Sequence, residues 1–266
     1  MKSLQHYICN ATLIGLCLAA TSGAYAQVGS INSVVISHVF NDMAGATVTP
    51  VNSYPGSVTL SESGVTRVAS GGLNRDVWQF SNNGSTAYQF QGNDYFNASF
   101  TLTLSGGESN VDLEGGFLFS NPSGNFGGDD QIVAVGQGGN AGVVFQAGGP
   151  SFNLFYPNGT YINGTAITMG FNYVVDPNTS NPAFQYSVNG VFANAGTGGT
   201  TYYDLGGPVG NPGDVLGGYF QMGNGDANNS GQALFSNISI IAVPEPATIA
   251  LLGLGLVPLM ARRLRK

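Results

Sequence analysis

The sequence predicts an all-β protein, an antiparallel β-sandwich or jelly roll, from its composition and its patterning. The chain has 41 glycines in 266 residues, but 42% of the residues are apolar and 11% are aromatic, which suits a packed β protein rather than a disordered one. Short apolar or alternating runs are separated by Gly-Gly, Asn-Gly or Asp-Pro turns, and no window between the two ends keeps a helical period. Many short strands with such turns are typical of sandwiches and jelly rolls.

The clearest strand is predicted from Tyr95 to Leu104, because its even-numbered residues are apolar and its odd-numbered residues carry polar groups. One face of this strand should be buried and the other wet. Asn82-Asn83-Gly84 predicts a hairpin turn. The other predicted strands are 31–40, 58–60, 65–69, 77–80, 88–90, 115–120, 131–135, 143–147, 152–156, 167–175, 184–188, 200–205, 215–222 and 234–243.

The N-terminus predicts a signal peptide over residues 1–26. Lys2 precedes an apolar run, and Ala24-Tyr25-Ala26 forms an A-x-A site, so Ala24 and Ala26 are the expected recognition residues for signal peptidase. The chain's 2 cysteines, Cys9 and Cys17, would leave with this peptide. The mature body, residues 27–242, is therefore expected to have no disulfide and no thiol chemistry.

The charge of the body is strongly negative. Of the 7 cationic residues, Lys2 and the four in the C-terminal tail lie outside the body, so 2 remain. Of the 14 acidic residues, Glu245 alone lies outside, so 13 remain and the net charge of the body is −11. Binding to a phosphate backbone needs clustered cations. Nucleic acid is therefore excluded as a partner, and neutral glycans or divalent cations fit better.

The C-terminus, residues 243–266, combines three features. Pro244, Glu245 and Pro246 come first, and the apolar, uncharged residues 247–261 follow. At about 1.5 Å per residue this run makes a short transmembrane helix that falls below the ~30 Å thickness of the hydrocarbon core. Four cationic residues close the chain, namely Arg262, Arg263, Arg265 and Lys266. Such a segment would anchor the chain in the inner membrane, either permanently or until it is removed.

These three parts resemble the PEP-CTERM sorting signal of Gram-negative bacteria. The resemblance implies recognition by an exosortase, a membrane-embedded enzyme, and export to the cell surface or to extracellular polysaccharide. It concerns where the protein goes and says nothing of what the body does.

Parts of the body resemble the concanavalin A-like lectin/glucanase jelly roll. Residues 114–119 would be a core strand, residues 185–190 a strand that ends in a tight Asn-Gly turn, and residues 235–240 the closing strand. The resemblance spans about residues 75 to 241 and implies the fold, without a ligand.

One pattern raises the question of catalysis. Asn110, Asp112 and Glu114 would point to one face of a strand, and two carboxylates at such a spacing can act as nucleophile and acid. Family 16 glucanases of this fold have Glu-x-Asp-x-Glu, and here Asn110 replaces the first carboxylate. A polar, solvated strand face is the favoured interpretation.

Calcium is the cation considered. Asp226, Asn228, Ser230 and Gly231 match the first half of a calcium loop, but its last position is Asn237 instead of glutamate. Calcium could also bind near residues 129–130. An Asx-rich turn is the favoured interpretation, so no cofactor is expected.

Histidine and aromatic residues are expected to be mainly structural. His38, the one histidine of the mature body, lies in a predicted strand and should be buried. Trp78 should belong to the core. Adjacent strand residues face opposite ways, so one of Tyr202 and Tyr203 should be exposed and could stack on a sugar ring.

The sequence therefore predicts an exported, non-enzymatic β-sandwich that is processed at its tag and associated with the cell surface or extracellular polysaccharide, with glycan binding as its role. A glycoside hydrolase-like enzyme that uses Asp112 and Glu114, or a calcium-stabilised adhesive module, are the alternatives.

Overall fold

The computed structural model describes residues 28–41, 45–65, 73–92, 94–107, 112–120, 130–138, 141–142, 144–147, 153–156, 159–194, 199–204, 214–223 and 229–243. The predicted signal peptide with Ala24 and Ala26, and the tail from Pro244 to Lys266, lie outside these residues. Within the described ranges, no helix has the length and apolar character needed to cross a membrane.

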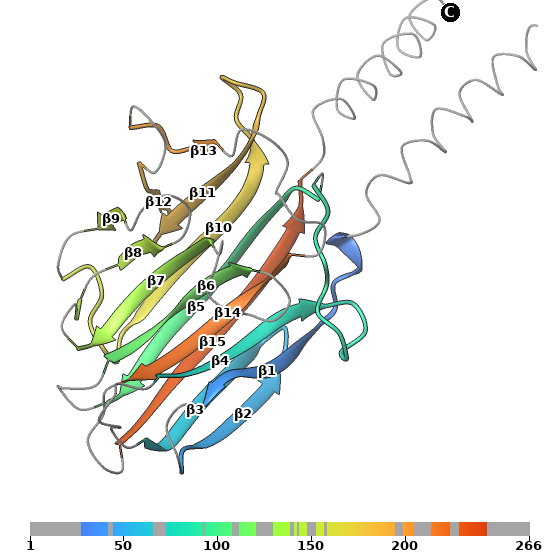
Figure 1. Cartoon of the computed structure of the whole chain (residues 1–266). Helices are drawn as coiled ribbons and strands as arrows, with labels where there is room; N and C mark the ends of the chain where they lie inside the picture. Colours follow the sequence, from blue (N-terminus) through green and yellow to red (C-terminus); the bar gives the residue numbers. More distant parts are fainter. Residues whose placement is uncertain are drawn as a thin grey trace, which may run out of the picture.

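The body is built from two antiparallel sheets, which confirms the predicted sandwich (Figure 1). The seven-stranded sheet consists, in spatial order, of β1 (Ser33–Asn41), β4 (Leu73–Ser81), β14 (Val215–Gly223), β6 (Asp112–Ser120), β7 (Asp130–Gln137), β8 (Val144–Ala147) and β9 (Asn153–Tyr156). The eight-stranded sheet consists of β12 (Val191–Phe192), β11 (Pro182–Val188), β10 (Ala166–Val175), β5 (Phe96–Gly106), β15 (Asn229–Ala242), β3 (Ser57–Val65) and β2 (Thr47–Ser53), with β13 (Tyr203–Asp204) also pairing with β11. A 3-10 turn, η1 (Val28–Ser30), precedes β1.

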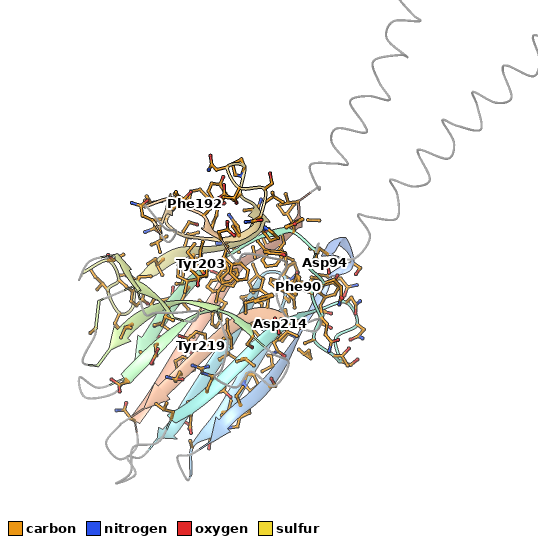
Figure 2. The ribbon with its side chains drawn as sticks, turned by 45° about the horizontal axis from the view of Figure 1, so that its top comes forward. Phe90, Asp94, Phe192, Tyr203, Asp214 and Tyr219 are labelled. Atoms are coloured by element: carbon orange, nitrogen blue, oxygen red, sulfur yellow. The ribbon has the colours of Figure 1, made fainter. Side chains whose placement is uncertain are left out.

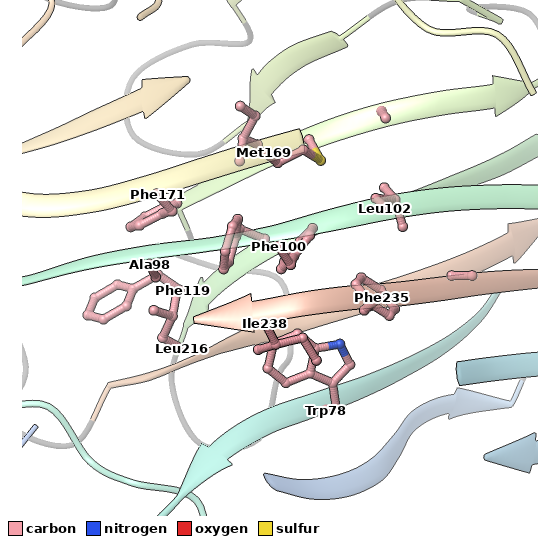
Figure 3. Packing of buried hydrophobic residues seen from close by; sticks show 14 of the residues in the cluster. Trp78, Ala98, Phe100, Leu102, Phe119, Met169, Phe171, Leu216, Phe235 and Ile238 are labelled. Atoms are coloured by element: carbon pink, nitrogen blue, oxygen red, sulfur yellow. The ribbon is translucent and has the colours of Figure 1, made fainter. Parts of the chain in front are cut away.

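Aromatic side chains from both sheets fill the space between them (Figure 3). The Trp78 indole packs edge-on against Phe80, Phe100 and Phe235. Phe100 and Phe117 stack across the two sheets with their ring centroids 3.9 Å apart. This core forms because β5 alternates buried and wetter residues, as its sequence predicts.

Glycine is required in the middle of the seven-stranded sheet. The space that a side chain would take at Gly218 is occupied by the rings of Trp78 and Phe235. A Cβ at Gly217 would collide with the Trp78 carbonyl oxygen, and one at Gly116 with the Ile132 carbonyl oxygen. Close backbone approach at these positions lets the large rings of the core fit.

The predicted Asn-Gly turn after residue 188 is confirmed. Asn189 and Gly190 have φ angles of 49° and 78° and connect β11 to β12. Positive φ at both central positions is the pattern of a type I′ turn, which Asn-Gly favours. The Asn189 side chain accepts a hydrogen bond from the Thr168 backbone N–H at 3.0 Å.

Several predicted elements are wrong or differ in extent. Residues 88–90 form no strand: Tyr88 and Phe90 enter the core from an irregular segment whose N–H groups bond to the carbonyls of Phe80 and Asp214. Asn83 closes a local turn instead of a hairpin, because its side-chain oxygen accepts from the N–H groups of residues 85 and 86. Of the predicted strand 200–205, residues 203–204 are paired.

Two strands were missed by the sequence pattern. β2 is an edge strand whose residues are mostly exposed and which contains Pro50, so it lacks an apolar alternation. β12 is two residues long, which is too short to show a sequence pattern. β3 also replaces the separate strands expected at 58–60 and 65–69 with one strand that ends at Val65, and residues 66–69 lie outside the description.

Replacing Phe100 by alanine should destabilise the fold by about 3–5 kcal/mol, because it removes the stack on Phe117 and leaves a cavity. Urea unfolding of the mature protein measures this. Val51→Ala on β2, where the side chain is 53% exposed, is the matched control and should change the free energy of unfolding by less than about 0.5 kcal/mol. Equal effects of the two substitutions would contradict the packing described above.

Candidate functional site

A buried polar row crosses the outer face of the seven-stranded sheet, on the side away from the core. The register of β4, β14 and β6 aligns Arg75 with Gln221 and Gln221 with Glu114. Arg75 Nε donates to Gln221 Oε1 at 2.9 Å, and Gln221 Nε2 donates to Glu114 Oε1 at 2.9 Å. Arg75 and Gln221 are only 1% and 4% exposed. The row is therefore a linked chain of side chains that is buried at Arg75 and Gln221 and half-buried at Glu114.

Tyr219 lies beside this row, two residues before Gln221 on β14 (Figure 2). The Arg75 guanidinium sits over its ring, with Cζ 4.7 Å from the centroid, a geometry that favours cation–π attraction. The tyrosine also belongs to a small apolar cluster on the same outer face, which contains Val77, Leu118, Val133, Val135 and Tyr219. The outer face of this sheet is thus a second buried layer.

Burial changes the acid–base properties of the row. Desolvation raises the pKa of Glu114, while the nearby Arg75 charge acts in the opposite direction. Desolvation also raises the pKa of Tyr219, and the Glu114 carboxylate adds to this rise. The Tyr219 hydroxyl lies near Glu114 without a hydrogen bond of good geometry in the described part of the chain. Burial therefore favours the protonated form of both Glu114 and Tyr219, and for Glu114 the Arg75 charge opposes this effect.

The structure agrees in part with the prediction for the carboxylate pair of Asp112 and Glu114. Asp112 and Glu114 both lie on β6 and share its outer face, as expected from the spacing. The predicted polar face holds only in part, because both side chains are half-buried and Glu114 is hydrogen-bonded to Gln221. Asn110 lies outside the described residues. The pair can offer one acid with a raised pKa and one half-buried carboxylate.

A second polar group lies between the two sheets. Glu62 on β3 and Asp76 on β4 are each 1% exposed, and Asn74 is also buried. Neither carboxylate oxygen of Glu62 has a hydrogen-bond partner of good geometry within the described residues. Burial, followed by the neighbouring Asp76 carboxylate, raises the pKa of Glu62 to about 9. The two acids therefore form a close pair in which Glu62 keeps its proton at neutral pH.

His38 lies on the solvent-facing side of the Glu62–Asp76 pair. Its Nδ1 is 2.5 Å from Asp76 Oδ1, and its side chain is 33% exposed. The prediction that His38 is buried is therefore wrong. The residue lies at an irregularity in the pairing of β1 with β4, which brings the ring to the rim of the sandwich while one nitrogen still reaches Asp76.

Metal ligands were expected to be absent or limited to calcium. Within the described ranges, no group of three or more His, Cys, Asp or Glu side chains is arranged to hold a metal. Asp226, Asn228 and residue 129 lie outside these ranges. Ser230 and Gly231, which would continue the calcium loop, are already part of β15. The calcium prediction therefore stays untested at its first positions.

The aromatic candidates are mostly structural. Trp78 is fully buried, which confirms its assignment to the core. The prediction that one of Tyr202 and Tyr203 is exposed is wrong: both are half-buried, and Tyr203 packs against the core from β13. Phe192 on β12 is 44% exposed and lies with Tyr203 at one edge of the eight-stranded sheet (Figure 2).

The sequence pattern missed the partners that hold Glu114. Arg75 and Gln221 lie in strands predicted from their apolar neighbours, and their polar side chains look like solvated residues of such strands. One signal was available for Arg75: it is one of 2 cationic residues in an otherwise acidic body, which suggests a specific partner. No sequence signal pairs Gln221 with Glu114, since 107 residues separate them.

The C-terminal residues 242–266 match the family model of the PEP-CTERM protein-sorting motif, which confirms the predicted tag. The match includes Pro244, Glu245, Pro246 and the basic cluster of Arg262, Arg263, Arg265 and Lys266. The motif implies export in a Gram-negative bacterium, a membrane-anchored state in transit and processing by an exosortase. No curated protein matches the chain.

Several solved structures are similar to the body. Alginate lyase AlgAT5 from polysaccharide lyase family 7 is 14% identical, with a TM-score of 0.44, over 80% of this chain and 95% of its own. The family 7 alginate lyase A1-II' is 12% identical, with a TM-score of 0.44, over 74% and 84%. The Emp46p carbohydrate recognition domain is 7% identical, with a TM-score of 0.41, over 75% and 96%. Identities this low concern the fold and not the site.

Glu62→Gln should stabilise the protein at pH 7 by on the order of 1–3 kcal/mol, because an unfolded glutamic acid gains free energy by ionising whereas Glu62 in the folded state stays protonated. The raised pKa of about 9 means that wild-type stability falls as the pH rises from about 4.5 to about 9. Glutamine removes that dependence. Urea unfolding at pH 4, 7 and 9 tests this: the variant should match the wild type at pH 4 and exceed it at pH 7 and 9. A constant difference at all three values would contradict the assignment.

Proposed function

We propose that the mature body is a non-enzymatic protein that binds neutral extracellular polysaccharide after export, at the cell surface or within the extracellular matrix. The observation that carries this proposal is the outer face of β3, β15, β5 and β10 in the eight-stranded sheet, which presents hydroxyl and amide side chains without charge. We call this surface the hydroxyl face. The sorting motif, which implies export, supports the location.

The hydroxyl face is a regular array, because antiparallel pairing aligns side chains across neighbouring strands. Two rows illustrate it. One row runs across β3, β15 and β5, and a second runs across β15, β5 and β10, with all members half-buried or exposed. The two rows are Ser61, Gln232 and Ser105, and Ser236, Thr101 and Thr168. Hydroxyl and amide groups both donate and accept hydrogen bonds, as sugar hydroxyls do.

The absence of charge on this face defines the kind of ligand. Glu62 is the one acidic residue of β2, β3, β5, β10 and β15, and its side chain is buried between the sheets. These strands contain no Lys or Arg that could neutralise an acidic sugar. A polyanionic glycan would meet a body with a net charge of −11 and 2 cationic residues, so a neutral glycan is the better ligand.

The polar row on the other sheet supports the non-enzymatic part of the proposal. Glu114 already accepts a hydrogen bond from Gln221, which in turn holds Arg75, and both of these partners are almost fully buried. Catalytic carboxylates must reach the scissile bond from both sides. A carboxyl group that is linked through Gln221 to a buried guanidinium has a structural role available without any substrate.

Removing two hydroxyls from the hydroxyl face should weaken glycan binding about tenfold, since each lost hydrogen bond is worth roughly 0.5–1.5 kcal/mol. The variant is Thr101→Ala with Thr168→Ala, whose hydroxyl oxygens are 3.5 Å apart across β5 and β10. Affinity electrophoresis with soluble galactomannan, xyloglucan and dextran measures binding, with alginate as the polyanion.

The matched control is Thr179→Ala with Thr200→Ala, two exposed threonines that lie outside the strands of this face. The control should bind like the wild type, and neither protein should bind alginate. Loss of binding in the control to the same degree, or retention by alginate gels alone, would contradict the proposal.

The second candidate function is a glycoside-active enzyme, and the raised pKa of Glu114 is the observation that favours it, because a buried protonated carboxyl group can act as a general acid. We expect the mature protein to release no reducing sugar from the same polysaccharides. Turnover that disappears in Glu114→Gln, with the fold retained by circular dichroism, would replace the non-enzymatic proposal by the enzymatic one.

A further inference from the structure

The sorting motif and the folded body share residues. The match to the motif begins at Ala242, which is also the last residue of β15. The next residue is still attached to the body, since the Val243 N–H donates to the Tyr95 carbonyl oxygen at 2.9 Å. Pro244 has no N–H to continue such a ladder. No linker therefore separates the sandwich from the tag.

β15 has two parts that are held differently. Its first part, from Asn229 to Ser236, pairs with β3 on one side and β5 on the other. An irregularity follows at Asn237, which has a φ of 51°, and the second part, Ser239 to Ala242, pairs with β5 alone among the described strands. Among the described strands, the end of β15 is therefore held by β5 alone.

Burial also falls along the strand. Phe235 is fully buried and Ile238 is 6% exposed, whereas Ile241 is 63% exposed. Ile240 and Ala242 are half-buried and pack against the core from one side. A segment that has few buried apolar contacts and is hydrogen-bonded to one neighbouring strand can detach locally. The free energy of this local opening is lower than the free energy of unfolding the whole domain.

We propose that residues 239–243, the terminal segment, detach from β5 and bind the processing exosortase as an extended strand. A membrane-embedded enzyme needs chain on both sides of its recognition motif, and the folded body occupies the N-terminal side up to Val243. Detachment frees five residues while β15 stays anchored through the doubly paired part from Asn229 to Ser236. Once detached from β5, the backbone of the terminal segment offers the enzyme strand pairing.

The test locks the terminal segment onto the body with a disulfide. Ser239 and Ser99 are direct partners on β15 and β5, and the Cα separations of antiparallel partners suit a disulfide. The variant Ser239→Cys with Ser99→Cys is expressed as the full chain in a host that carries the exosortase. Because Cys9 and Cys17 lie in the predicted signal peptide, the engineered pair has no competitor.

We expect conversion of the precursor to the processed form, followed by pulse-chase and immunoblotting, to slow at least about tenfold, because the local opening is blocked. A membrane-permeant reductant should restore the wild-type rate. Insertion of a six-residue Gly-Ser spacer between Val243 and Pro244 of the locked variant should also restore it, since the spacer supplies free chain.

The control disulfide joins Leu234→Cys to Thr103→Cys, a partner pair in the doubly paired part of β15. It should leave processing at the wild-type rate. Wild-type processing of the locked variant, equal slowing by the control disulfide, or failure of the spacer to rescue would each overturn the proposal.

Discussion

The burial of the central strand β14 on both faces is the constraint on which the rest of the structure depends. Every residue of β14 is buried, although it lies in a sandwich in which a strand normally keeps one wet face. Its inner side chains meet the aromatic core, where Gly218 makes room for Trp78 and Phe235. Its outer side chains, Tyr219 and Gln221, form a second layer. The protein thus builds two interiors on one sheet without a disulfide in the described body.

Polar groups in these interiors differ according to their partners. Arg75, Gln221 and Glu114 are linked by hydrogen bonds along the register of three strands, so the guanidinium charge has a carboxyl group close by. Glu62 and Asp76 instead meet as two acids between the sheets, and one proton has to stay between them. Burial raises the carboxyl pKa in both groups, but the neighbouring Arg75 charge opposes the rise at Glu114, whereas the neighbouring Asp76 adds to it at Glu62.

The two sheets also differ in what they present to the outside. The seven-stranded sheet holds its polar row in a buried layer, whereas β3, β15, β5 and β10 expose uncharged hydroxyls and amides. β15 is central to the second sheet and passes directly into the sorting motif. The strand at the centre of the proposed binding face is therefore also the one next to the site of processing. Its irregularity at Asn237 lies between the part that belongs to the binding face and the part that leads into the sorting motif.

The sequence by itself determined the fold class, most strands and the tag, because alternation, Asn-Gly turns and the Pro-Glu-Pro motif are local patterns that depend on neighbouring residues. It could not predict β2, whose exposed edge lacks alternation, nor the irregular path of residues 88–90. Only the tertiary structure decided that Gln221 bridges Arg75 and Glu114, and that His38 reaches Asp76 from the rim. Such contacts join strands far apart in the chain, and their register is set by the packing of both sheets.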